Sequence, residues 1–79
     1  MARVLLFGRL SDIAGWRERE LDAPTLAALR TTLAAEDAAL AEALAAPGVQ
    51  VALDQAIVRG DAGLTAASEV AFLPPMSGG

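Results

Sequence analysis

The most informative pattern of the chain lies in residues 68–79, Ser68-Glu69-Val70-Ala71-Phe72-Leu73-Pro74-Pro75-Met76-Ser77-Gly78-Gly79. Apolar side chains alternate in residues 69–73, so we predict a strand there. Pro74 and Pro75 each fix φ at about −65° and donate no backbone hydrogen bond. They therefore end the strand and turn the chain away from the sheet.

The segment after this strand ends in residues without side chains and is long when extended. Gly78 and Gly79 have no Cβ atom, so this end can enter a channel that excludes other residues. Fully extended, residues 74–79 span about 20 Å. We predict one folded domain in residues 1–73 and a flexible tail in residues 74–79; the alternative is a frayed chain end. We expect Gly79 to enter a partner's channel first. The residues expected to follow it are Gly78, Ser77, Met76, Pro75 and Pro74.

Composition restricts the chemistry of the chain. Its 79 residues fit one small domain, and they include no Cys, His, Lys or Tyr. A thiol nucleophile, a thiolate metal site and a Schiff base are therefore excluded, and a serine has no obvious base to activate it. We expect no metal, no bound cofactor and no catalysis by the chain alone. The distinctive reactive group is the α-carboxylate of Gly79.

Charge and hydropathy exclude two classes of partner. The net charge is −4, and the six Arg are dispersed along the chain, which argues against binding of nucleic acid. No apolar run approaches the roughly 20 residues of a membrane span, and no signal peptide is visible. We therefore predict a cytoplasmic protein without a membrane partner.

The remaining pattern predicts an α+β order. Alternating side chains predict strands at residues 2–9, 16–22, 49–53, 57–58 and 69–73. A leucine stripe behind Thr25 predicts the main helix, and Asp37 is expected to cap a shorter second helix. Ser11, Asp12 and Gly15 indicate a loop. Strands grouped around helices on one face are typical of an α+β domain.

The strand pattern also divides the sheet into two faces. If Val4, Leu6, Val70 and Phe72 face the helix, the alternating residues lie on the open face. Those residues are Leu5, Phe7, Ala71 and Leu73, with Ile57 beside them. Exposed apolar patches of this kind often mark a protein interface.

Four stretches of the chain resemble one family: residues 4–10 with Asp12 and Gly15, residues 25–30, residues 51–55 and, most strongly, residues 68–79. They are similar to the ubiquitin-like β-grasp sulfur carriers, above all to the small subunit of molybdopterin synthase, the MoaD family. The ending Pro-Pro-x-Ser/Thr-Gly-Gly is the most specific element. The resemblance implies a mixed sheet packed on one main helix plus a short second helix. The family often has Arg where this chain has Ser11, so no role is carried over to Ser11.

The resemblance also implies a sulfur relay. An E1-like adenylyltransferase would adenylylate the Gly79 carboxylate with ATP and Mg²⁺, and sulfur from a sulfurtransferase would replace AMP to give a thiocarboxylate. The charged carrier would then dock on the large subunit of molybdopterin synthase and donate sulfur to cyclic pyranopterin monophosphate, forming the dithiolene of molybdopterin. Two small and two large subunits would form a heterotetramer. The chain is then the sulfur-donating subunit of a sulfurtransferase and is not catalytic alone.

An apolar surface is expected to supply much of the affinity, because ordering the tail costs about 1–2 kcal/mol per residue in backbone entropy. We predict that Phe7, Ile57 and Leu73 form this surface, with Arg9 and Arg59 at its rim. The alternative is that Phe7 and Leu73 are ordinary, partly buried sheet residues.

Three other functions stay open on the sequence. The chain could carry sulfur for thiazole, cysteine or tRNA thiolation. It could be a ubiquitin-like modifier joined through Gly79 to lysines of target proteins. It could be a β-grasp interaction module whose tail has no function, in which case deletion of Gly79 would be tolerated.

Overall fold

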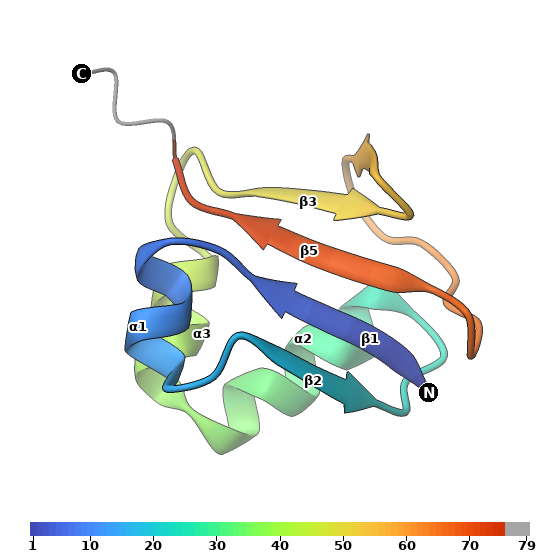
Figure 1. The fold of residues 1–79 in the computed structure, drawn as a ribbon, viewed down its shortest axis with the longest axis horizontal. Coiled ribbons are helices and arrows are strands. Elements are labelled where there is room, and N and C mark those ends of the chain that lie inside the picture. Colours follow the sequence, from blue (N-terminus) through green and yellow to red (C-terminus); the bar gives the residue numbers. More distant parts are fainter. Residues whose placement is uncertain (76–79) are drawn as a thin grey trace.

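A mixed five-stranded sheet carries three helices on one of its faces in residues 1–75, the part of the chain that the computed structural model describes (Figure 1). The elements in chain order are β1 (Ala2–Leu6), α1 (Arg9–Ala14), β2 (Glu18–Leu21), α2 (Leu26–Glu36), α3 (Ala38–Leu44), β3 (Gln50–Leu53), β4 (Ala56–Val58) and β5 (Glu69–Leu73). None of the described helices is long and apolar enough to span a bilayer.

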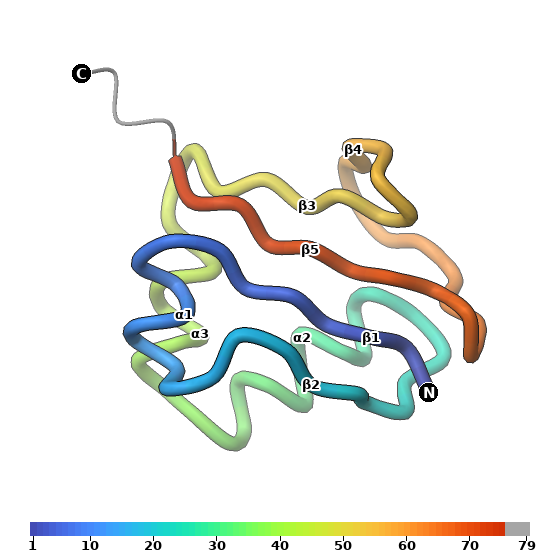
Figure 2. Tube along the Cα trace, in the orientation of Figure 1, coloured from blue at the N-terminus to red at the C-terminus, as the bar shows by residue number. Residues whose placement is uncertain are grey.

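The last strand lies in the centre of the sheet, whose strand order is β2-β1-β5-β3-β4 (Figure 2). β5 pairs in parallel with β1 and antiparallel with β3, and the other neighbouring strands are also antiparallel. The predicted α+β class and mixed sheet are therefore confirmed, and the 69–73 stretch forms its middle.

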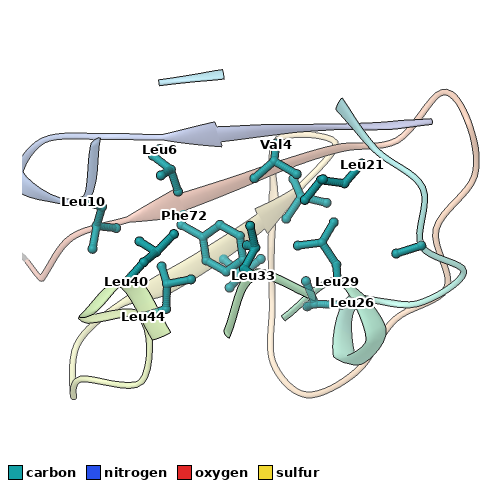
Figure 3. Packing of buried hydrophobic residues seen from close by; sticks show 13 residues of the cluster. Val4, Leu6, Leu10, Leu21, Leu26, Leu29, Leu33, Leu40, Leu44 and Phe72 are labelled. Atoms are coloured by element: carbon teal, nitrogen blue, oxygen red, sulfur yellow. The ribbon is translucent and has the colours of Figure 1, made fainter. Parts of the chain in front are cut away.

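The core lies between the sheet and the helices (Figure 3). Val4, Val70 and Phe72 are completely buried, as the alternation predicts, and Leu29 and Leu33 of α2 face them. The other large side chains of this core are Leu6, Leu10, Leu21, Leu26, Leu40, Leu44 and Val51. Nearly all are leucine or valine, so the core depends on aliphatic packing around one aromatic ring.

Side-chain caps begin the two longer helices, as the sequence predicts. Thr25 Oγ1 accepts a hydrogen bond from Ala28 N at 3.1 Å at the start of α2. Asp37 Oδ1 accepts one from Leu40 N at 3.0 Å at the start of α3. The break predicted at Asp37 therefore separates two helices.

The prediction was wrong at residues 7–15. β1 ends at Leu6, before the predicted limit at residue 9, and the expected loop contains the short helix α1. Gly8 adopts φ 58° and ψ −135°, a conformation with positive φ that interrupts the strand. Leu10 is then turned into the core, and its burial stabilises a helix of six residues.

Candidate functional site

The base of the predicted tail lies at the end of the central strand. Leu73 ends β5, and Pro74 and Pro75 follow it. Neither proline belongs to a strand, which agrees with the expectation that they end the pairing. The four residues on which the predicted chemistry depends lie outside the described part of the chain; they are Met76, Ser77, Gly78 and Gly79.

A row of apolar residues crosses the face of the sheet opposite the helices, which we call the open face. Leu5 of β1 is in register with Ala71 of β5, Ala71 with Ala52 of β3, and Ala52 with Ile57 of β4. Partners in register point to the same side of a sheet, so these four side chains share one face. The row joins segments that are far apart in the sequence.

A second row lies one step closer to the tail. Phe7 follows β1, and its N–H donates to the carbonyl oxygen of Phe72 at 3.3 Å. The next residue of β5 is Leu73, which is in register with Gln50 of β3. Phe7 is 46% exposed and Ile57 48% exposed, whereas Leu73 is half-buried. We call Leu5, Phe7, Ile57 and Leu73 the apolar patch; it borders the base of the tail.

Ala71 differs from the expectation of an exposed position. It lies on the open face as predicted, but it is buried, like its register partner Ala52. Both are small side chains in inner strands, so the larger neighbours on either side cover them. The apolar patch is therefore formed by larger side chains around two buried alanines.

The opposite end of the open face is charged. Arg3 of β1 is in register with Glu20 of β2 and with Glu69 of β5. Its guanidinium contacts a carboxylate oxygen of Glu69 at 3.1 Å and one of Glu18 at 3.4 Å. Apolar and charged side chains thus occupy different ends of one face, and the apolar end is the one next to Pro74.

The two predicted rim arginines lie in different places. Arg59 is exposed and follows β4, next in sequence to the strand that carries Ile57. Arg9 is also exposed, but it is the first residue of α1 and lines a hollow with Ala39 and Ala43 of α3. Arg9 therefore lies beside the helices, at the end of the molecule where β5 ends.

The structure adds features that the sequence did not reveal. Ser11 donates from both its N–H and its Oγ to the carbonyl oxygen of Gly8, so it anchors the turn between β1 and α1. Gly8 and Gly48 lie against the two prolines. Their positive φ angles could be inferred from turn chemistry, but contacts between residues so far apart in the sequence could not. Within residues 1–75, no three acidic side chains come together to hold a metal ion.

Several proteins of known structure have this arrangement of strands and helices. The small archaeal modifier protein 1 from Methanosarcina acetivorans matches with a TM-score of 0.88 over 99% of this chain and 95% of that chain, at 21% identity. CysO, an antigen of Mycobacterium tuberculosis, matches with a TM-score of 0.81 over 96% of this chain and 100% of that chain, at 19% identity. Identities this low establish the fold alone, and that fold is the ubiquitin-like β-grasp.

Sequence comparison then identifies the family. The ThiS family matches residues 4–79. The molybdopterin synthase sulfur carrier subunit of Escherichia coli (strain K12) is 38% identical to this chain over the full length of both. The chain therefore belongs to the ThiS family, among ubiquitin-like proteins of the MoaD/ThiS sulfur-carrier type. This confirms the resemblance stated from the sequence.

Proposed function

We propose that this protein is the sulfur carrier subunit of a molybdopterin synthase. The observation that carries the proposal is the full-length 38% identity with the Escherichia coli protein of that name. The position of the apolar patch supports it, because a surface next to the tail base allows one partner to hold the domain and receive the tail. The tail would comprise residues 74–79.

The proposed chemistry takes place at the Gly79 carboxylate. A free carboxylate is a poor acyl donor, so an E1-like adenylyltransferase activates it with ATP and Mg²⁺, releasing pyrophosphate. The terminal sulfur of a sulfurtransferase persulfide then attacks the acyl adenylate and displaces AMP. A thiol reductant cleaves the resulting acyl disulfide and leaves a thiocarboxylate on Gly79. The chain has no Cys, so a separate sulfurtransferase supplies the sulfur. The thiocarboxylate attacks cyclic pyranopterin monophosphate at the large subunit, and two rounds complete the dithiolene.

The domain supplies binding energy that the tail lacks. Ordering each tail residue costs about 1–2 kcal/mol of backbone entropy, and two glycines and a serine bury little apolar area in return. Burial of the half-exposed Phe7 and Ile57 on a partner offsets this cost. We propose that Phe7, Ile57 and Leu73 contact the large subunit, that Arg9 and Arg59 flank the contact, and that two copies of each subunit assemble in the cytoplasm.

The intact mass of the chain tests this function. The protein is incubated with its host's E1-like enzyme, ATP, Mg²⁺ and sulfide. We expect the mass to rise by the difference between one sulfur and one oxygen atom, and a variant lacking Gly79 to stay unchanged. The charged protein, mixed with the large subunit and the pterin precursor, then yields the dithiolene. An unchanged mass, under conditions that convert a known carrier, would contradict the proposal.

A further inference from the structure

Two glycines on separate turns lie against the two prolines that follow β5. A Cβ atom added to Gly8 would lie 3.1 Å from Cγ of Pro74, and one added to Gly48 would lie 2.9 Å from Cβ of Pro75. Both distances are shorter than the optimal separation of two carbon atoms, about 3.5–4.0 Å. A side chain at either glycine would therefore displace a proline ring.

The two turns belong to the strands on either side of β5. Gly8 follows β1 and Gly48 precedes β3, and these are the two strands that pair with β5. Figure 2 shows both turns, blue and yellow-green, at the end of the molecule where β5 ends. Ser11 N and Oγ donate to Gly8 O at 3.1 and 2.8 Å, and Val49 N donates to Ala46 O at 3.3 Å across the second turn. Each turn is thus held by its own hydrogen bonds.

Pro74 and Pro75 have no N–H, so the sheet cannot hold them by the donors that hold the rest of β5. Contact with an anchored turn on each side therefore limits the directions in which the chain leaves the sheet. The four residues that follow, 76–79, extend by at most about 14 Å. A change of direction at the prolines consequently displaces the position that the last residue can reach.

We propose that Gly8 and Gly48 are positioning residues that seat the diproline and so direct the tail toward the partner's active site. The inference rests on the proposed sulfur-carrier function. Neither glycine contacts the reacting atoms; each acts through the proline beside it. A reacting group misplaced by about 1 Å can lose on the order of 100-fold in rate, so a small displacement of the rings is sufficient to matter.

The test compares Gly8→Ala and Gly48→Ala with the matched control Gly60→Ala. Gly60 has φ 87°, close to the 90° of Gly48, but no atom lies within 4 Å of an added Cβ. Alanine at position 60 therefore introduces the backbone strain without the contact. The readout is the single-turnover rate of sulfur transfer from the thiocarboxylated carrier to the pterin precursor at saturating large subunit, with Kd measured separately.

We expect Gly8→Ala and Gly48→Ala to lower this rate at least about tenfold while Kd changes less than about threefold. Gly60→Ala should keep the wild-type rate. Equal rates for Gly48→Ala and Gly60→Ala, or a loss explained entirely by Kd, would overturn the positioning role and leave the carrier function intact. A wild-type chain that accepts no sulfur would overturn the carrier function itself.

Thermal unfolding shows whether the alanine variants fold. If the variants at positions 8 and 48 do not fold, Pro75→Ala is used in their place. This substitution removes the proline ring that lies against Gly48 and leaves the glycine turn unchanged. Its control is Pro47→Ala, at an exposed proline in the same turn. We expect Pro75→Ala to lower the single-turnover transfer rate at saturating large subunit, where a change in Kd does not affect the rate, and a rate equal to that of Pro47→Ala would overturn the proposal.

Discussion

Asp37 serves two helices at once. Its backbone N–H donates to Leu33 O at 3.0 Å at the end of α2, and its side chain accepts from Leu40 N at 3.0 Å at the start of α3. The residue has extended backbone angles, φ −150° and ψ 100°, so the chain changes direction here without a glycine. A single carboxylate therefore allows one helical sequence to fold as two helices.

We expect Asp37→Ala to lower the free energy of unfolding by about 1 kcal/mol, because a backbone donor of α3 loses its partner. In a domain of this size that corresponds to a fall in Tm of about 4–8 °C. Asp37→Asn is the matched control, since its side-chain oxygen can still accept the hydrogen bond. Thermal unfolding of the three proteins checks the prediction, which fails if the alanine and asparagine variants unfold together.

At the scale of elements, an ion pair joins β2 to the end of α2. The Arg19 guanidinium lies 2.7 Å from a carboxylate oxygen of Glu36 and also stacks over the Trp16 ring at 5.1 Å. The hydrogen bond from Arg19 lowers the pKa of Glu36 below its ordinary value of 4.5. The same bond raises the pKa of Arg19.

The lowered pKa of Glu36 gives a pH dependence with a definite sign. The folded state binds a proton at Glu36 less readily than the unfolded state, so this stabilisation is fully present above about pH 4.5 and is lost as the pH falls through the folded-state pKa. We expect Glu36→Gln to be slightly less stable than wild type at neutral pH and equal to it in acid. Urea unfolding over a pH series measures this difference.

The effect of Glu36→Gln should be small and should weaken with added salt, because both partners are at the surface. Glu42→Gln is the control, since Glu42 forms no ion pair with the described residues 1–75. A stability difference between wild type and Glu36→Gln that is constant from neutral to acid pH would rule out this linkage.

Elements with long patterns could be predicted from the sequence, and α1 could not. A stripe of leucines repeated over three turns predicts α2, and alternation over five residues predicts β5. The six residues of α1 make fewer than two turns, which is too short for a period to be recognised. Its serine and aspartate, with glycines at both ends, are also the residues of loops. The buried Leu10, three residues before Ile13, was the available signal.

One part of the candidate site could be predicted from the sequence, because it follows from the alternation of side chains along a strand. The side on which Phe7, Ile57 and Leu73 lie follows from the period of a strand. The burial of Ala71 does not, because it depends on which residues of β1 and β3 flank it. The contacts of Gly8 and Gly48 with the prolines depend on where the fold places two distant turns. A local sequence pattern cannot predict such contacts.

At the scale of the whole molecule, the two phenylalanines differ in burial on the two faces of the sheet. Phe72 points to the helices and is completely buried, with the Arg30 guanidinium 5.3 Å from its ring. Phe7 adjoins it through a backbone hydrogen bond, yet is 46% exposed on the open face. The chain has no other phenylalanine. Phe72 therefore belongs to the core on the helix side of the sheet, whereas Phe7 is available to a partner on the open face.

Phe72→Ala should cost about 3–5 kcal/mol, because it removes the only aromatic ring of the buried cluster. A domain of this length has a total stability of roughly 4–12 kcal/mol, so the loss takes a large share of it. Phe7→Asp should leave Tm nearly unchanged. Circular dichroism melts of the two variants, beside wild type, measure this contrast.

Binding to the large subunit should depend on Phe7, although its replacement leaves folding nearly unchanged. Phe7→Asp places a charge in the apolar patch, so we expect its Kd for the large subunit to rise at least about tenfold, as for a residue at the centre of an interface. Glu20→Lys, at the charged end of the same face, is the control for a general effect of charge and should bind within about threefold of wild type. Unchanged binding by a folded Phe7→Asp variant would refute the docking role of the patch. Because the mass measurement on Gly79 does not depend on docking, the sulfur-carrier chemistry would survive that result.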